Sequence, residues 1–291
     1  MSAAEHQAHM RASAAFAPPP PPAAKATGGA GAEDAPALFA PADKLYSGPA
    51  LWNSEGPVAV APGVAPTAYG PHGHHVEHHG WSPYDFNGGT ALGIAGSDFC
   101  VLAADTRLST GYSILSRDVS RATQLGNQCV VATGGCWTDV QTLHKVLSSR
   151  VHMYEHDHES EISCTAVAQM LGNTLYYRRF FPYYAFNVVG GIDNEGKGAV
   201  FTYDAVGSFE RVKYAAQGAG QKLIIPLLDN LVGNKNRTDP ERVLTIDETV
   251  EMMKDVFVTA GERDIYTGDK VEIYIMTRDG IRTETFDLKA D

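Results

Sequence analysis

The sequence predicts an α+β fold of two stacked sheets with a layer of helices on each outer face. Short apolar runs typical of strands occur in groups, at about 90–133, 186–215 and 270–288. Segments with helical periodicity fill the intervals, at about 139–179 and 221–260. Separate groups of strands and helices indicate sheets that pack against each other and against helices.

Residues 1–79 do not have the composition of a folded domain. Prolines fill positions 18–22, and 13 of the 16 prolines lie at or before Pro83. Alanine and glycine dominate the remainder, which offers few large aliphatic side chains for a core. We expect a disordered Pro/Ala/Gly-rich leader over 1–79 and one folded domain over 80–291, long enough to bury a substantial core.

The first half of the domain begins with strands. The runs 90–95 and 99–104 are separated by Gly96-Ser97-Asp98 and predict a hairpin. Further strands are expected at 112–115 and 128–133, after which Gly134 and Gly135 should break the pattern.

Two helices are expected next. Apolar side chains recur at helical spacing at Val140, Leu143, Leu147, Val151 and Tyr154. They predict a helix over about 139–155, and a second helix is expected at about 165–179, before Pro182.

The second half repeats this order. Strands are predicted at 186–190, 199–204 and 209–215. Helices follow at about 221–231 and 246–260, and the second opens with Thr245 and Glu248 in capping-box spacing. The runs 270–277 and 281–288 predict a closing hairpin.

Composition limits the partners and cofactors. A net charge of -11 without a basic patch argues against nucleic acid or an anionic membrane surface as a partner. No apolar run approaches the roughly 20 residues of a membrane span. Four cysteines without metal-ligand spacing are expected to be reduced core thiols of a cytoplasmic or nuclear protein.

Five histidines lie close together just before the predicted domain. Proline and glycine interrupt this segment, so any ligand set would have to be ordered by the metal itself. We therefore favour a solvated tail over a metal site and expect neither metal nor cofactor. These histidines are His72, His74, His75, His78 and His79.

One motif resembles a known catalytic frame. Gly88-Gly89-Thr90-Ala91-Leu92 leads through an apolar run to Asp105-Thr106-Arg107. This layout resembles the start of 20S proteasome beta subunits, in which an N-terminal threonine, an aspartate, an arginine and a lysine set up attack on a peptide carbonyl. Alignment on Leu92 and Asp105 places Gly89 at the threonine position and Arg121 at the lysine position.

The residues themselves argue against catalysis. A nucleophilic hydroxyl needs a group that exchanges a proton near neutral pH. Glycine has no side chain, and arginine does not deprotonate in a protein. The chain has no lysine between Lys44 and Lys145, so a small misalignment cannot restore the base.

Thr90 is the alternative nucleophile, because Gly89-Thr90 is similar to the junction at which active subunits are cut. Its use would shift the nucleophile by one residue relative to Asp105. On a strand, that shift turns the side chain to the opposite face. An active threonine endopeptidase that uses Thr90 therefore remains the alternative function.

A second cluster carries the same resemblance. Glu262-Arg263-Asp264-Ile265-Tyr266-Thr267-Gly268-Asp269 keeps the family's aspartate at Asp264 but has Thr267 where serine is usual. The family's serine-glycine-serine appears as Ala219-Gly220-Gln221. The resemblance thus implies a degenerate site at Gly89, Asp105, Arg107, Arg121, Ala219, Gln221 and Asp264.

Within this family, the chain most resembles the noncatalytic sixth beta subunit. The resemblance covers about 81–291 and rests on Ser82-Pro83-Tyr84-Asp85-Phe86-Asn87, Arg178-Arg179-Phe180-Phe181-Pro182-Tyr183-Tyr184, Gly190-Gly191-Ile192-Asp193 and the segment from Glu262 to Asp269. It implies the four-layer αββα sandwich of N-terminal nucleophile hydrolases. It also implies a propeptide cut by a neighbour between His79 and Gly80.

The implied role is structural. The resemblance predicts contacts with beta subunits of the same and the facing ring and with alpha subunits, and a contribution to ATP- and ubiquitin-dependent protein degradation through assembly and channel shape. The aromatic residues over 176–184 are either contacts or core. A third hypothesis is an unrelated binding protein that uses the leader. It predicts a monomer, whereas membership of a ring predicts a much larger particle.

Overall fold

The computed structural model describes residues 82–235, 238 and 243–291. The predicted leader, its histidines and the predicted cut between His79 and Gly80 lie outside these residues. The described residues contain helices α3–α6 and strands β1–β12, so the predicted α+β mixture of helices and sheets is confirmed.

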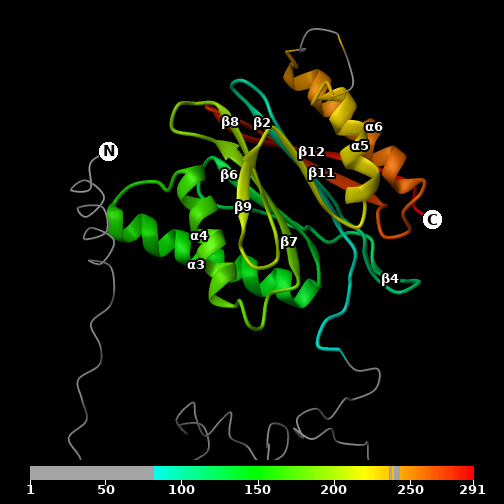
Figure 1. Ribbon diagram of the computed structural model, residues 1–291, viewed down its shortest axis with the longest axis horizontal. Helices are drawn as coiled ribbons and strands as arrows, with labels where there is room; N and C mark the ends of the chain where they lie inside the picture. Colours follow the sequence, from blue (N-terminus) through cyan, green and yellow to red (C-terminus); the bar gives the residue numbers. More distant parts are fainter. Residues whose placement is uncertain (1–81, 236–237, 239–242) are drawn as a thin grey trace, which may run out of the picture. The chain divides into compact units, whose positions relative to one another are not determined.

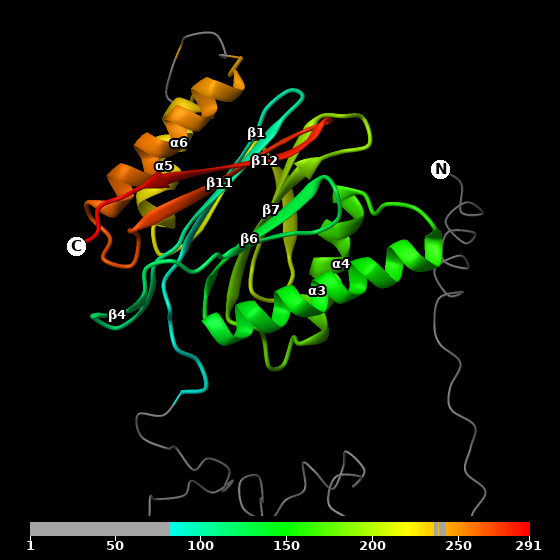
Figure 2. The ribbon, with the colours of Figure 1, turned by 180° about the vertical axis from the view of Figure 1, so that it is seen from behind.

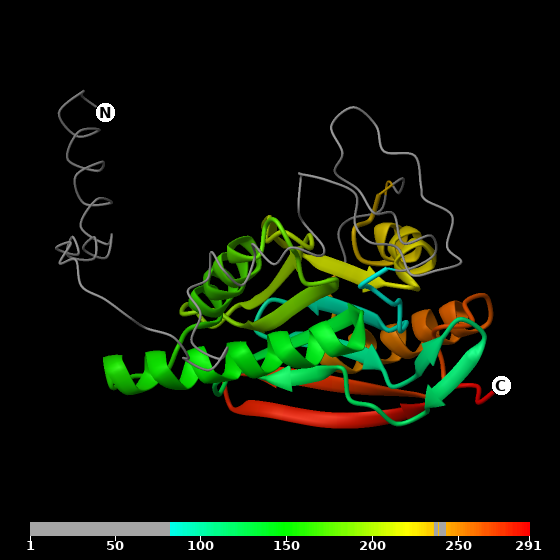
Figure 3. The same cartoon turned by 90° about the horizontal axis from the view of Figure 1, so that it is seen from below.

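The first sheet has five antiparallel strands. Across the sheet they are β10 (Tyr214–Gly218), β1 (Thr90–Ala95), β2 (Cys100–Asp105), β11 (Lys270–Thr277) and β12 (Gly280–Asp287). Two predicted hairpins, β1–β2 and β11–β12, are confirmed. Figure 3 shows β12, in red, along the outer edge of this sheet.

The second sheet also has five antiparallel strands. They are β5 (Ala122–Gln124), β6 (Cys129–Gly135), β7 (Ala185–Ile192), β8 (Gly198–Tyr203) and β9 (Phe209–Val212). A separate two-stranded sheet pairs β3 (Leu108–Thr110) with β4 (Ser113–Ser116), and it extends away from the sheets in both Figure 1 and Figure 2.

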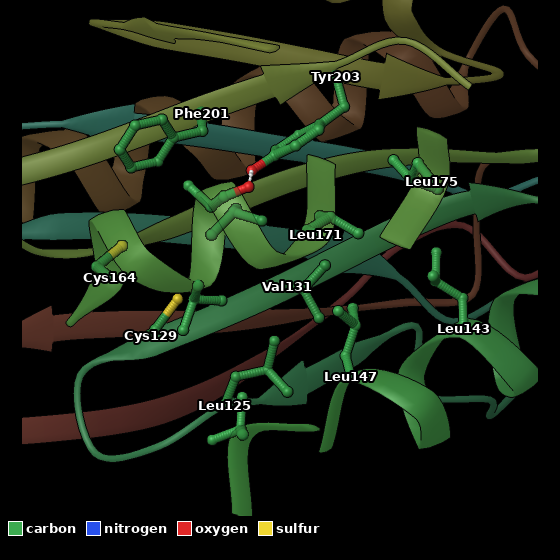
Figure 4. Close-up of a cluster of buried hydrophobic side chains, with 14 of the residues drawn as sticks. Leu125, Cys129, Val131, Leu143, Leu147, Cys164, Leu171, Leu175, Phe201 and Tyr203 are labelled. Atoms are coloured by element: carbon green, nitrogen blue, oxygen red, sulfur yellow. Dashed lines mark hydrogen bonds between the residues drawn. The ribbon is translucent and has the colours of Figure 1, made fainter. Parts of the chain in front are cut away.

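Helices α3 (Trp137–His158) and α4 (Cys164–Tyr177) cover one face of the second sheet (Figure 2). The helices bury Leu143, Leu147 and Leu171 against Val131 and Phe201 of the strands (Figure 4). The Tyr203 hydroxyl, at the end of β8, donates a 2.7 Å hydrogen bond to the Ala168 carbonyl, so this buried polar group is satisfied.

Helices α5 (Gln221–Leu231) and α6 (Ile246–Gly261) cover one face of the first sheet (Figure 1). As predicted, α6 begins with a capping box between Thr245 and Glu248. Its buried stripe includes Met253 and Phe257, which pack with Ile273 of β11 and its neighbours.

A third core cluster joins the remaining faces of the two sheets. Side chains alternate between the faces of a strand, so Leu102 of β2 joins this cluster while Val101 joins the helix-facing one. Likewise, Val188 of β7 lies in this cluster while Val189 packs under α3 and α4. The central strands of each sheet therefore bury side chains on both faces.

Two strand predictions are wrong. The predicted strand 209–215 is two strands: β9 pairs with β8, whereas β10 pairs with β1 of the other sheet. The predicted break at Gly134 and Gly135 does not occur, because β6 continues through both residues and pairs there with Phe186 and Ala185. Strands β3 and β5 were not predicted, since three residues are too few to show a period.

The other elements agree with the predictions to within three residues at either end. The helices predicted at 139–155 and 165–179 are Trp137–His158 and Cys164–Tyr177. All four cysteines are buried and free, as expected. No helix in the described part of the chain is long and apolar enough to cross a membrane.

Candidate functional site

Gly89 lies directly before β1 and requires glycine for two reasons. Its φ is +91°, a conformation that side chains disfavour, and a Cβ there would lie 2.6 Å from the guanidinium carbon of Arg121. No side chain fits at position 89 while Arg121 holds this place.

Arg121, one residue before β5, is fully buried. Its Nη2 donates hydrogen bonds to the carbonyls of Asn87 (2.7 Å) and Arg107 (2.5 Å), and its Nε lies 3.8 Å from Asp105 Oδ1. Burial lowers the pKa of Arg121, and the Asp105 carboxylate opposes that shift. Among the described residues, its Nε and Nη1 have no hydrogen-bond partner.

Asp105, the last residue of β2, supports the backbone around Gly89. Its Oδ1 accepts from the Thr90 amide at 2.8 Å and its Oδ2 from the Gly268 amide at 3.3 Å. Burial raises the pKa of Asp105 to about 6, while Arg121 and both amides lower it. The carboxylate therefore ties β1 to the segment before β11.

Thr90, the first residue of β1, is fully buried and its hydroxyl is fully engaged. The Gly220 amide donates to Thr90 Oγ1 at 2.9 Å, and this oxygen lies 2.7 Å from Thr267 Oγ1. Because Thr267 donates its own proton to Asp264 at 2.6 Å, the Thr90 hydroxyl is the donor to Thr267. Arg121 takes no part in this chain of hydrogen bonds.

Hydrogen bonds hold the chain just before Gly89 from two sides. On one side, the Asn87 amide donates to the Gly135 carbonyl at 3.1 Å, and the Gly135 amide donates to the Gly88 carbonyl at 3.0 Å. On the other, the Ser109 amide donates to the Asn87 carbonyl at 3.4 Å. The Asn87 side chain adds hydrogen bonds to the Ser109 carbonyl and from the Trp137 amide. The backbone groups that border Gly89 are thus already used by the chain itself.

Aromatic side chains hold the residues further upstream. Phe86 packs edge-on against Tyr184 and Tyr266, with ring centroids 6.4 and 5.6 Å away. The Tyr84 hydroxyl donates to the Pro182 carbonyl at 2.9 Å. The extension ahead of Gly89 therefore has a defined path across the surface.

Within the described residues, the Arg107 side chain makes no hydrogen bond to the other predicted site residues. Its Nε donates to Asp269 Oδ2 at 2.8 Å, and its Nη1 donates to the Ile265 carbonyl at 3.0 Å. The hydrogen bond from Arg107 to Asp269 raises the pKa of this guanidinium. Arg117 also pairs with Asp269. Because Ile265 and Asp269 both belong to the loop between α6 and β11, the Arg107 side chain anchors this loop.

Of the remaining predicted residues, Ala219 and Asp264 are connected to the residues around Gly89, whereas the Gln221 side chain is not. The Ala219 amide donates to the Gly89 carbonyl at 3.0 Å, and Asp264 is connected to Thr90 through Thr267. Gln221 begins α5, and in the described structure its side chain makes no hydrogen bond to the other site residues. The structure therefore brings together Gly89, Asp105, Arg121 and the Ala219 backbone, and leaves the side chains of Arg107 and Gln221 aside.

Asn87 and Asp269 are important here but were not predicted. Asn87 lies in a segment that resembles the family, but nothing in that segment predicts that its carbonyl binds Arg121. The residues around Asp269 in the sequence likewise do not identify Arg107 and Arg117 as its partners. In the residues that the structure covers, no three His, Cys, Asp or Glu side chains are grouped so as to hold a metal ion.

Comparison with known proteins gives consistent matches. The family model described as "Proteasome subunit" matches residues 85–276. "Proteasome subunit beta type-1" of Arabidopsis thaliana is 57% identical over 220 residues, which is 74% of this chain and 99% of that protein. The protein of the same name from Petunia hybrida is 53% identical over 216 residues, covering 72% of this chain and 97% of its own length. "Proteasome subunit beta type-6" of Saccharomyces cerevisiae is 42% identical over 223 residues, covering 73% and 92%.

Proposed function

Because this chain belongs to the proteasome family and is a 20S proteasome beta subunit, we propose that it builds the beta ring without cleaving peptide bonds. The observation that carries this proposal is the pairing of Gly89 with Arg121. A nucleophile at position 89 would collide with the guanidinium, and the guanidinium cannot serve as its base.

The state of Thr90 supports the proposal. Its hydroxyl lies in a closed series of hydrogen bonds from Gly220 to Asp264. Its amide is held by Asp105 within an unbroken strand register, in which Thr90 pairs with Gly218. A working nucleophile needs access to the substrate, and the fully buried side chain of Thr90 does not have it.

The segment ahead of Gly89 supports an uncut junction. Asn87 and Gly88 make hydrogen bonds with Ser109 and Gly135, so a cut at Gly89 would remove a segment that the rest of the domain holds in place. We propose that a neighbouring active subunit removes residues 1–79 by cutting between His79 and Gly80. The Arabidopsis relative, covered almost entirely by the match, aligns with only 74% of this chain, which is consistent with an additional leader here.

We further infer that the domain is the four-layer αββα sandwich of the N-terminal nucleophile hydrolase type. The three core clusters support this, since one lies between the sheets and the other two lie under the helix pairs. Such a layered body leaves the loops and helix surfaces free for neighbours.

The proposed partners are beta subunits of the same and the facing ring and alpha subunits, in cytoplasm and nucleus. Through assembly and channel shape the chain would contribute to ATP- and ubiquitin-dependent protein degradation. No observation in the described structure favours Thr90 as an active nucleophile.

Covalent labelling tests the proposal. Native particles are treated with an inhibitor that reacts with N-terminal threonine, and the intact mass of every subunit is measured. We expect mass shifts on the active subunits, which serve as the internal control, and none on this chain. An adduct at Thr90 would contradict the proposal.

A further inference from the structure

The end of α4 and the turn that follows expose an unusual number of aromatic side chains. The exposed fractions are 65% for Tyr176, 85% for Tyr177, 99% for Phe180 and 57% for Phe181. The last residues of the same run differ: Tyr183 is buried and Tyr184 is partly buried. The two alternatives predicted for this segment therefore apply to different residues, since its first four aromatic side chains are exposed and its last two are buried or partly buried. We call the four exposed residues the aromatic patch.

The aromatic patch lies outside the hydrophobic core beneath α4. Helix α4 packs on its sheet through Val167, Leu171 and Leu175, which are fully buried on another side of the helix. Soluble monomers seldom gather large apolar side chains on one exposed segment, because each leaves its hydrocarbon surface in water. Adjacent exposed aromatics of this kind indicate a surface that another protein covers.

The aromatic patch lies on a well-defined backbone. Hydrogen bonds of 3.0 Å run from the amides of Arg178, Arg179 and Phe181 to the carbonyls three residues earlier. The Phe181 ring packs on Tyr84 with centroids 5.9 Å apart. A preorganised patch loses little conformational entropy on binding, which is typical of interface anchors.

Two arginines set the charge of this surface. Arg178 stacks over the Tyr183 ring at 4.7 Å, and Arg179 lies beside it on the exposed turn. Within the described residues, neither guanidinium forms an ion pair with a carboxylate. Tyrosine and arginine are also enriched among the residues that dominate binding energy at interfaces.

This charge decides between possible occupants. The chain as a whole carries a net charge of -11, so two unpaired cations beside an apolar patch are a local exception. A second copy of this chain docked patch to patch would bring the arginines of both copies together, which is unfavourable. A partner with carboxylates around an apolar pocket would pair with both features.

We propose that the aromatic patch, with Arg178 and Arg179, is a permanent interface with a different subunit of the same particle, which presents acidic side chains around an apolar pocket. This inference rests on the proposed function, because it requires that the chain is assembled.

Photocrosslinking tests it in the full-length chain. A photoreactive benzoylphenylalanine is placed at Phe180, assembled particles are isolated by native mass, and the crosslinked peptides are sequenced. We expect crosslinks to one other subunit, in a peptide that contains aspartate or glutamate. Particles that contain the chain but give no crosslink, or a crosslink to a second copy, overturn the inference and leave the proposed function standing.

A charge-reversed variant gives an independent readout. Arg178→Glu/Arg179→Glu should lower incorporation into particles about tenfold or more, because carboxylates would then face carboxylates. The matched control Arg178→Lys/Arg179→Lys keeps the charge and should assemble at close to the normal level, and circular dichroism checks that both variants fold. Equal incorporation of the two variants would refute the interface, whereas a wild-type chain absent from all particles would refute the proposed function as well.

Discussion

At the scale of single residues, Gly89 and Arg121 depend on each other. The guanidinium occupies the space that a Cβ at position 89 would need, and it binds the carbonyl of Asn87 just upstream. Asp105 compensates part of the buried charge at 3.8 Å and holds the Thr90 amide. Gly89 and Arg121 therefore have a structural role, in which the glycine leaves room for the guanidinium and the guanidinium binds the neighbouring backbone.

Gly89→Thr should therefore destabilise the chain. We expect the free energy of unfolding to fall by about 2–5 kcal/mol, from left-handed backbone strain and from overpacking against Arg121. Urea denaturation of the purified chain measures this. The control Gly111→Ala also has a positive φ, of +55°, but meets open space, so it should cost only the backbone strain of about 1–2 kcal/mol.

Adding Arg121→Lys to Gly89→Thr sharpens this test. The lysine clears the space at position 89 but loses hydrogen bonds to two carbonyls. The double variant should be destabilised by less than the sum of the two single variants. Additive losses would mean that the two positions are not coupled.

His144 gives the domain a defined response to acid. Thr133 donates to Asn187, so it accepts from His144 Nε2 at 2.8 Å, and Nδ1 accepts from Thr123 at 2.8 Å. Burial lowers the pKa of His144 to about 4. The neutral ring is therefore part of the core beneath α3.

We expect a loss of stability as the pH falls from about 6.5 to about 4. In that window the unfolded chain binds a proton at His144 and the folded chain does not, so the free energy of unfolding falls by roughly 3 kcal/mol at about 1.4 kcal/mol per pKa unit. Denaturation midpoints measured across this range should fall more steeply for the wild type than for His144→Gln.

Asp105 contributes to the pH dependence with the opposite sign. Its pKa is raised to about 6 by burial, so its contribution to stability is lost as the pH rises from about 4 to about 6. Because Asp105 is unchanged in His144→Gln, the difference between the two curves isolates His144. Parallel curves would show that His144 does not stay neutral in the folded chain.

At the scale of elements, the capping box of α6 illustrates how local sequence determines a boundary. The Thr245 hydroxyl accepts from the Glu248 amide, and the Glu248 carboxylate accepts from the Thr245 amide. These bonds satisfy backbone donors that have no partner within the first helical turn. The helix begins at Ile246 for that reason.

Thr245→Ala should lower the free energy of unfolding by about 1 kcal/mol through loss of the cap. Thr259→Ala in the same helix is the matched control, since the Thr259 hydroxyl donates to the Asp255 carbonyl and caps no helix end, and alanine favours helix. Thermal denaturation compares the two. A similar result for both would argue that the cap does not stabilise α6.

Elements were predictable where their signals are local. The predicted bounds of β1, α5 and β11 agree with the structure, because glycine or other turn residues flank each of these segments. The boundary between β9 and β10 was not predicted, because the residue types of a continuous strand-like run do not indicate where the chain passes from one sheet to the other. Gly134 was expected to end a strand, but its missing side chain instead admits the Gly89 carbonyl, which is a tertiary contact.

At the scale of the whole molecule, the candidate site could be located from sequence but not assembled. The missing base was readable from the residues, and the positions of Gly89 and Arg121 came from family resemblance. The hydrogen bonds of Asn87 and the pairing of Arg107 with Asp269 join residues far apart in the chain. The periodicity of a sequence does not predict contacts between such distant residues, so the roles of Asn87, Arg107 and Asp269 could be found only in the structure.

The central claim is that the chain keeps an extension ahead of Gly89 and acts as a structural subunit of its ring. Intact mass and N-terminal sequencing of this chain from native particles test it most directly. The account predicts a start near Gly80, which retains Asn87 and Gly88 with their hydrogen bonds to the domain. A start at Thr90 would expose a threonine amine beside Asp105 and contradict the account.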